Sequence, residues 1–219
     1  FAFGPLMPAP ALAAASAKTL ANLNTAVQSE SNAAQGNAKS AKKAVTDEFP
    51  QVGKLFRAAS AAESIQRDTH RQTIIELVEP LLPFQSEAVT PGSTAENLQA
   101  AITGESHERD TLYPEFPALA KPEDSRPAIP TLNFALQSEK QHARLYQNAS
   151  DNFGKNLPAE YYVCQECGKT LLNHPEKIPG SPDGTEEFSR IDQHSLETKP
   201  LPITCKTMTE EPPELMTVK

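Results

Sequence analysis

Two glutamates three residues apart, Glu105 and Glu108, lie on an otherwise apolar stripe of one predicted helix. Residues three apart on a helix share a face, so both carboxylates point the same way. A looser copy of this stretch, residues 94–108, begins 75 positions earlier, and in it Glu30 matches Glu105. A glutamate is almost never fully buried unless it is paired or binds a metal. The repeat therefore predicts half of a metal site.

Three more candidate ligands lie on two other predicted helices. Glu63 belongs to the second helix, and Glu139 and His142 belong to the last, where they form a Glu-x-x-His spacing. Two divalent ions held about 3.5–4 Å apart need bridging anions, which carboxylates supply. Imidazole suits iron as a ligand and leaves it redox-active. Without a metal, four or five inward-facing carboxylates would repel one another, and several would have to be protonated.

Apolar residues that recur at three- and four-residue steps predict four helices to position these side chains. The predicted helices cover residues 18–45, 50–82, 94–112 and 129–152. Ser93 begins the third helix as its cap, with Glu96 as the capping acid. Pro83 ends the second helix, and Pro114 and Pro117 kink or end the third.

The second and fourth helices also repeat, at an offset of 76 residues. Glu63 matches Glu139, and Gln66 falls on His142. Two similar helix pairs predict a pseudo-twofold four-helix bundle, and residues 83–93 are long enough to form the crossover between the pairs.

The composition excludes several classes of function. The 219-residue chain has a formal net charge of −8 and no block of lysines or arginines, which argues against a nucleic-acid partner. No run of about 18 apolar residues is present, so we predict no membrane span. The 20 prolines gather at the ends and in the linkers, which predicts a compact helical middle with irregular termini.

The first 17 residues are apolar and rich in small residues, and they resemble the trailing half of an export signal. The chain starts at Phe1 rather than Met, which indicates a processed or trimmed end. An exported protein would lie in a periplasm or in an organelle lumen such as the thylakoid. A flexible Pro/Ala-rich leader on a cytoplasmic protein is the alternative, and the sequence leaves both open.

Together, the glutamates and the histidine are typical of ferritin-like di-iron and di-manganese bundles. In those bundles two helices present single glutamates, and the other two present a glutamate with a histidine three residues later. The alternative is a plain helical bundle, in which every one of these glutamates would point into solvent. The apolar stripes contradict that alternative, so we predict a two-metal site in the bundle core.

Over about residues 18–192 the chain resembles rubrerythrin, a family of ferritin-like di-iron proteins. The matching segments are residues 28–31, 54–63, 94–108 with 112–116, and 139–142. The resemblance implies a mainly α fold in three parts after the leader. These parts are a ferritin-like bundle over residues 18–155, a small rubredoxin-like β domain over 159–192, and an extended tail over 193–219.

The resemblance also implies two iron ions and a redox activity. The residues that fall on iron-ligand positions are Glu30, Glu63, Glu105, Glu108, Glu139 and His142. Tyr113 falls on the family's tyrosine near the site, where it would donate to a ligand carboxylate; a buried tyrosine with a satisfied hydroxyl is the alternative. The implied reaction is reduction of hydrogen peroxide with electrons from an external donor, with oxidation of ferrous iron as its near neighbour. A homodimer or a larger complex is the expected assembly.

One departure from the family lies on the second helix. The family has Glu-x-x-His there, and one iron moves between that histidine and the extra glutamate of the third helix as the redox state changes. Here the spacing reads Glu63-x-x-Gln66, and an amide oxygen is a weaker ligand. We expect that iron to stay with Glu108 in both redox states, or to bind more loosely.

A second departure lies in the C-terminal domain, which in the family holds one iron with two C-x-x-C segments. Cys164 and Cys167 form the first segment, but Ile178 and Ser181 stand where the second pair belongs. A rubredoxin-type iron therefore cannot form from this domain alone, and the electron relay is broken. Candidate ligands for a different site, such as one for zinc, are Cys205, His174 and His194. A disulfide within the first segment, or two free thiols, is the alternative.

These departures support a second hypothesis, a scaffold recruited as a structural or accessory subunit with a vestigial metal site. The retained glutamates argue against full decay, because unused buried carboxylates are costly.

Overall fold

The computed structural model describes residues 17–77, 80–84, 87–121 and 125–172, together with the backbone of two short strands at 188–190 and 199–201. Several sequence predictions concern residues outside this part of the chain. They are the export leader up to residue 16, the second cysteine pair at 178 and 181, and the ligand candidates at 174, 194 and 205.

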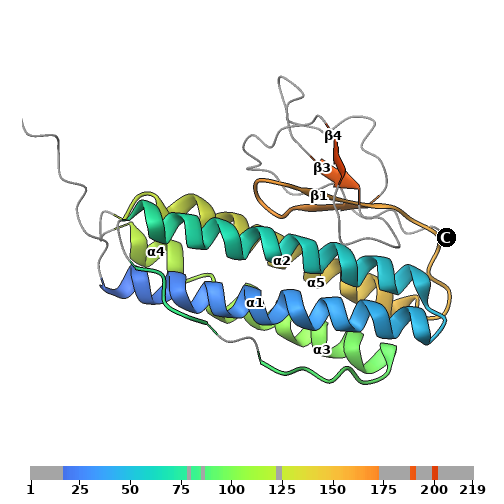
Figure 1. The fold of residues 1–219 in the computed structure, drawn as a ribbon. Helices are drawn as coiled ribbons and strands as arrows, with labels where there is room; N and C mark the ends of the chain where they lie inside the picture. Colours follow the sequence, from blue (N-terminus) through green and yellow to red (C-terminus); the bar gives the residue numbers. More distant parts are fainter. Residues whose placement is uncertain are drawn as a thin grey trace, which may run out of the picture.

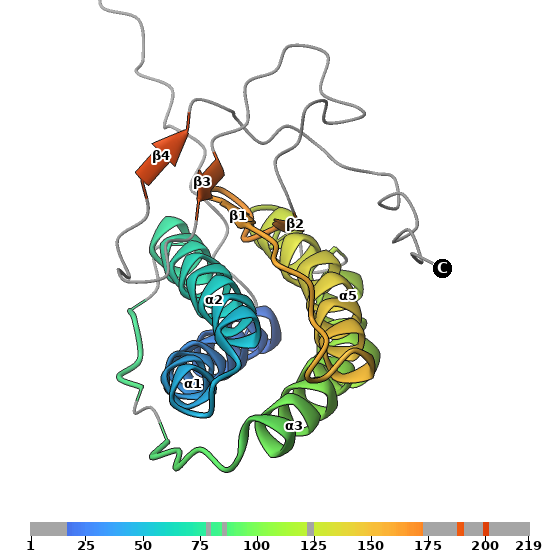
Figure 2. The same cartoon turned by 90° about the vertical axis from the view of Figure 1, so that its right-hand side faces the viewer.

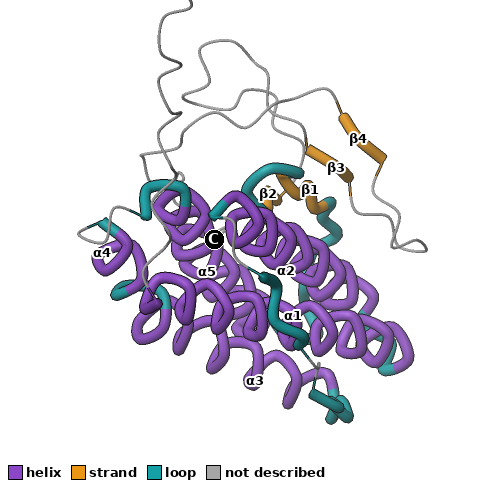
Figure 3. Tube along the Cα trace, turned by 60° about the vertical axis from the view of Figure 1, so that its left-hand side comes forward, coloured by secondary structure: helices purple, strands orange, loops and turns teal. Residues whose placement is uncertain are grey.

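Four long helices form the body of the protein, as predicted. The long helices are α1 (Ala17–Thr46), α2 (Pro50–Glu76), α3 (Thr94–His107) and α5 (Ala128–Asp151). Two short helices lie between α3 and α5: the π-helix η1 (Glu108–Leu112) and α4 (Phe116–Ala120). The long helices run alongside one another, and short α4 lies at one end of the bundle (Figures 1 and 3). The mainly helical prediction is confirmed.

The start of α3 is fixed by side-chain caps. Ser93 and Glu96 form the predicted capping box, in which the Ser93 amide donates to Glu96 Oε2 at 2.8 Å and the Glu96 amide donates to Ser93 Oγ at 3.4 Å. The Asp47 carboxylate, from the turn between α1 and α2, accepts from the amide and hydroxyl of Thr94 at 3.0 and 2.8 Å. The first helical hairpin is thereby tied to α3.

Two helix ends differ from the prediction. The second helix ends at Glu76 rather than at residue 82, because Pro80 lacks a backbone donor and restricts the residue before it. The third helix changes after His107 into a π-helical turn, in which the amide of Tyr113 donates to the carbonyl of Glu108 at 2.9 Å. Such turns are rare and gather at functional sites.

The bundle core consists of two hydrophobic clusters with polar residues between them. One cluster includes Phe56, Leu98 and Tyr146, and the other includes Leu23, Ile74 and Leu132. Along α1, α2 and α5, the residues between the clusters are buried glutamates and histidines. The apolar ends supply the packing that holds this polar middle in place.

A small antiparallel sheet follows the bundle, with strand order β2-β1-β3-β4. The strands are β1 (Tyr161–Cys164), β2 (Thr170–Leu172), β3 (Phe188–Arg190) and β4 (Lys199–Leu201). Strands β1 and β2 lie over α2 and α5, on the side away from α1 and α3 (Figure 2). Strand β4 lies in the segment predicted as an extended tail, and it pairs with β3.

Within the described residues, no helix combines the length and apolar character needed to cross a lipid bilayer.

Candidate metal centre

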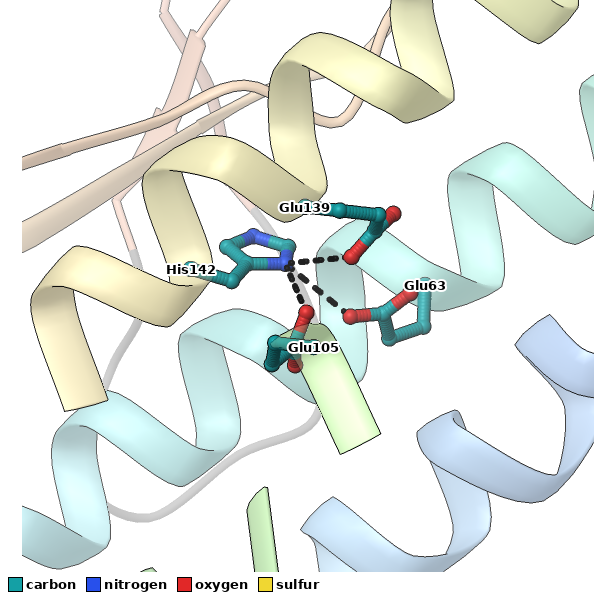
Figure 4. A group of neighbouring side chains, drawn as sticks. All are labelled: Glu63, Glu105, Glu139 and His142. Atoms are coloured by element: carbon teal, nitrogen blue, oxygen red, sulfur yellow. Dashed lines mark ion pairs between the residues drawn. The ribbon is translucent and has the colours of Figure 1, made fainter. Parts of the chain in front are cut away.

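Four side chains from three helices converge in the middle of the bundle (Figure 4). Glu63 comes from α2, Glu105 from α3, and Glu139 and His142 from successive turns of α5. The Nδ1 atom of His142 lies 3.0 Å from Glu63 Oε1, 3.6 Å from Glu105 Oε2 and 3.6 Å from Glu139 Oε2. Three carboxylates and one imidazole therefore point at a common centre.

The same four atoms are buried and have no hydrogen-bond partner. Buried polar atoms in proteins are nearly always paired, so four unpaired ones that face one another call for a bound group. Oxygen and imidazole nitrogen donors of this kind suit a divalent transition metal such as iron. The residues present therefore fit a metal ion.

A second set of carboxylates adjoins this cluster. Glu30 on α1 and Glu108 on η1 are buried, with exposed fractions of 0% and 6%. The hydroxyl of Tyr113 donates to Glu30, and the hydroxyl of Ser29 donates to Glu108. Each carboxylate thus has one oxygen held by a neighbouring hydroxyl, and the pair adds the ligands that a second metal would need.

Gln66 occupies the position at which the resembled family has a histidine. The amide orientation that satisfies its neighbours has the nitrogen donating to Glu63 Oε2 at 2.9 Å and to Glu30 Oε2 at 3.3 Å. In that orientation its oxygen accepts from Ser138 Oγ at 2.9 Å. Gln66 is therefore a hydrogen-bond donor to two carboxylates, and its amide oxygen, the weak ligand considered from the sequence, accepts from Ser138.

The site's charge is balanced by protons when no metal is bound. Burial raises the pKa of Glu63 to about 8, and the charges of Glu139 and Glu105 add to the effect. Burial likewise raises the pKa of Glu30, Glu105 and Glu108 well above the ordinary value, with further contributions from neighbouring carboxylates. A divalent cation would replace these protons.

Two members of the cluster shift in the directions that favour charge. Burial acts to lower the pKa of His142, but the neighbouring carboxylates of Glu105, Glu139 and Glu63 raise it overall, well above the ordinary value. Burial acts to raise the pKa of Glu139, but the neighbouring Glu105 side chain and the His142 ring lower it overall. Glu139 is thus the carboxylate that stays ionised most readily.

One buried histidine, which was not predicted as a site residue, contacts the tyrosine that donates to Glu30. His70 on α2 has its Nε2 3.2 Å from the Tyr113 hydroxyl and its Nδ1 2.8 Å from the Thr131 hydroxyl. Burial lowers the pKa of His70 to about 4, so the ring is neutral at pH 7. Since Tyr113 donates to Glu30, the His70 ring acts through Tyr113 on a candidate ligand. Its position seven residues after Glu63, on the same helix face, was the available signal.

The C-terminal segment also reaches the cluster. The Thr170 hydroxyl, on β2, lies 3.1 Å from His142 Nε2, and the Ser138 hydroxyl lies 3.4 Å from the same nitrogen. The Thr170 amide donates to Gln141 Oε1 at 2.8 Å, which fixes β2 against α5. The outer nitrogen of the His142 ring is therefore held by the sheet, a contact that no local pattern in the sequence indicates.

The C-x-x-C turn makes this approach possible. Gly168 follows Cys167 with a φ of 75°, and its amide donates to the Cys164 carbonyl at 3.1 Å. A Cβ at Gly168 would lie 3.0 Å from the Ala62 carbonyl oxygen and 3.1 Å from Gln66 Cγ. Only glycine allows both the backbone conformation and this close contact with α2.

Every residue predicted for the site is buried in the middle of the bundle: Glu30, Glu63, Glu105, Glu108, Tyr113, Glu139 and His142. The alternative of a plain bundle with outward-facing glutamates is wrong. The Tyr113 hydroxyl donates to Glu30, one of the candidate ligand residues.

A four-helix bundle with a carboxylate and histidine cluster in its core defines the ferritin-like class of metal-binding proteins. The rubrerythrin family model matches residues 21–150, more than half of the chain, and the chain therefore belongs to the rubrerythrin family. Rubrerythrins are di-iron proteins, and the buried cluster could hold two iron ions.

Individual relatives agree with this assignment. The chain is 34% identical over 133 residues to rubrerythrin-2 of Clostridium acetobutylicum, a match that covers 57% of this chain and 70% of that protein. It is 28% identical over 151 residues to nigerythrin of Nitratidesulfovibrio vulgaris, which covers 68% of this chain and 74% of nigerythrin. A solved structure of fully reduced, all-ferrous nigerythrin superimposes with a TM-score of 0.69, over 74% of this chain and 80% of that one.

Proposed function

We propose that this protein is a non-haem di-iron peroxidase that reduces hydrogen peroxide with electrons from an external donor. The observation that carries the proposal is the set of four buried, unpaired ligand atoms on Glu63, Glu105, Glu139 and His142. Membership of a family whose proteins use peroxide and electron donors supplies the reaction class.

The two sets of candidate ligands would divide between two metals. Glu105 and His142 would hold one metal, and Glu30 and Glu108 would hold the other. Glu63 joins the two sets, since its Oε1 faces His142 while its Oε2 lies beside Gln66 and Glu30. The charge of Glu139 raises the pKa of Glu105 in one set and of Glu30 and Glu108 in the other. Glu63 and Glu139 are therefore the candidates for bridging carboxylates.

Two ferrous ions in this site would supply the two electrons that convert hydrogen peroxide and two protons into two water molecules. The protein's part is to hold and orient the ligands in a buried environment. Tyr113 and Ser29 each donate to a carboxylate of the second set, which fixes Glu30 and Glu108 in place. Thr170 and Ser138 hold the outer nitrogen of His142. Burial excludes bulk water completely from four of the six candidate ligands, and Glu105 and Glu108 are only 4% and 6% exposed.

A separate reductant must reset the site. The sequence lacks the second cysteine pair of a rubredoxin domain, with Ile178 and Ser181 in its place. We therefore infer that electrons come from another protein or small molecule and not from an iron centre built by this chain alone.

The test is anaerobic reconstitution of the metal-free protein with ferrous iron, followed by addition of hydrogen peroxide. We expect two irons per chain and the loss of one peroxide for every pair of ferrous ions oxidised. The Glu63→Gln variant, which keeps side-chain volume but loses a charge, should bind fewer irons. A wild-type protein that binds iron but leaves peroxide intact would contradict the proposal.

Gln66 favours a second candidate function, that of a structural or accessory subunit with a vestigial site. An amide that donates to Glu63 and Glu30 can hold these carboxylates in place without any metal. Iron analysis of the purified protein separates the two candidates, because a vestigial site would hold no stoichiometric metal.

A further inference from the structure

A cavity of about 320 Å³ lies between α1 and α3 and reaches the metal centre. Its walls come from α1, α3, the start of η1, Phe56 of α2 and Val89 of the linker between α2 and α3. The residues that matter for its chemistry are Asn32, Gly36, Asn37, Gly104, Glu105 and Glu108. The space is large enough for several water molecules or for a molecule of similar size.

The exposure of the candidate ligands identifies this cavity as the open side of the site. Glu30, Glu63, Glu139 and His142 are 0% exposed, whereas Glu105 is 4% exposed and Glu108 is 6% exposed. The two ligands with any exposure are also the two that line the cavity. On the opposite side, β2 covers His142 through Thr170. A small molecule would therefore meet the site from the α1–α3 side.

The lining suits a small, neutral and polar molecule. Carboxamides and hydroxyls from Asn32, Asn37 and Ser40 lie along the walls, together with Asn97, which is bonded to the Gly92 backbone, and Ser29, which donates to Glu108. The lining includes no lysine, arginine or aspartate, and its titratable residues are His107 and the two candidate ligands Glu105 and Glu108. Hydrogen peroxide is neutral, carries two donors and four lone pairs, and is close to water in size.

Two helical glycines line the cavity. A Cβ added to Gly36 on α1 or to Gly104 on α3 would meet no atom within 4 Å outside the helix's own backbone. Glycine is unfavourable in a helix interior relative to alanine, and packing gives no reason for it at either position. What the two positions share is the free space of the cavity beside them.

We propose that the α1–α3 cavity is the route by which hydrogen peroxide reaches the metal centre, and that Gly36 and Gly104 keep this route open. The identity of the substrate rests on the proposed peroxidase function. The route itself rests on the cavity and on the exposure of Glu105 and Glu108.

The experiment narrows the cavity with leucine at each glycine and measures access with two probes. Gly36→Leu and Gly104→Leu are compared with the matched alanine variants and with Ala95→Leu, which adds leucine at an exposed α3 position outside the cavity. Each variant is reconstituted with ferrous iron under anaerobic conditions, and its iron content and melting temperature are measured. Stopped-flow absorption then follows the reaction of the ferrous site with nitric oxide and, separately, with hydrogen peroxide.

We expect the two leucine variants to bind as much iron as wild type and to react about tenfold more slowly with both probes. The alanine variants should be slowed less than the leucine variants, and Ala95→Leu should stay close to the wild-type rates. Should a leucine variant fail to fold, the other leucine variant and the intermediate Gly→Val substitutions carry the test. Unchanged nitric oxide rates in folded, iron-loaded leucine variants would overturn the route. If nitric oxide is slowed but wild type does not consume peroxide, the route stands and the substrate is overturned.

Discussion

The hydroxyl oxygen of Thr170 lies 3.1 Å from Nε2 of His142, while Nδ1 of the same ring faces three carboxylates. A ligand histidine needs its outer N–H satisfied, because that hydrogen bond fixes the tautomer and the orientation of the ring. In this protein the partner comes from β2 and not from a neighbouring helix. The position of the sheet on the bundle is thereby coupled to the metal centre.

The first prediction follows from this contact. Thr170→Val keeps the shape of the side chain but removes the acceptor of the His142 N–H, and only the Ser138 hydroxyl at 3.4 Å remains. We expect metal affinity to fall by roughly 10- to 100-fold, the usual effect of losing such a partner. Competition with a chelator measures it, and Thr170→Ser, which keeps the hydroxyl, is the control. Equal affinities of the valine and wild-type proteins would show that Thr170 only packs.

The second prediction concerns Gln66, whose amide donates to Glu63 and Glu30. Gln66→His replaces this donor with an imidazole, a ligand that suits iron. We expect the weaker of the two metals to bind roughly tenfold more tightly, equivalent to about 1.4 kcal/mol. Titration of the metal-free protein with ferrous or cobaltous ions measures both affinities. Gln66→Met, which removes the amide without adding a ligand, is the control and should show no gain.

The third prediction concerns Glu108, the buried carboxylate of the π-helical turn. Because Gln66 offers no imidazole to a second metal, we expect Glu108 to be needed in both redox states. Glu108→Ala should therefore leave one iron per chain, in the ferrous and in the ferric protein alike. Metal analysis after gel filtration measures the ratio, and Glu115→Ala, at an exposed position a few residues away, is the matched control. Two retained irons in Glu108→Ala would rule out this role.

Much of the site could be predicted from the sequence because it obeys helix geometry. Glu139 and His142 are three residues apart, so they share one helix face, and the internal repeat relates Glu63 to Glu139. The apolar stripes indicate that these faces point inward. The bundle follows from the same apolar stripes. These features depend on neighbours within one helix, and a sequence records such neighbours directly.

The remaining features depend on tertiary contacts. Thr170 contacts His142 although the two are 28 residues apart in the sequence, and the turn between them requires Gly168. No local sequence pattern links the two residues. The amide orientation of Gln66 is decided by Ser138 on another helix. The π-helical turn Glu108–Leu112, which contains Glu108, has no sequence pattern that predicts it.

The fourth prediction is the pH dependence of stability. Burial raises the pKa of Glu63 to about 8, and the pKa values of Glu30, Glu105, Glu108 and His142 are also raised. In the metal-free protein the folded state therefore binds more protons than the unfolded state, and stability falls as pH rises. The two groups with lowered pKa values act in the opposite direction at lower pH. Glu139 loses its stabilising contribution as the pH falls below the ordinary glutamate range. His70, whose pKa is about 4, makes stability rise with pH up to about pH 6.5.

Between about pH 6.5 and about pH 8, the groups with raised pKa values therefore determine how stability changes with pH. Urea unfolding of the metal-free protein across this window should give a free energy of unfolding that decreases with pH. Metal must displace these protons, so the metal-loaded protein should gain stability over the same range. Glu63→Gln removes one of the titrating groups and should flatten the slope of the metal-free protein. A metal-free protein whose stability rises between pH 6.5 and pH 8 would show that these carboxyl groups are ionised without metal.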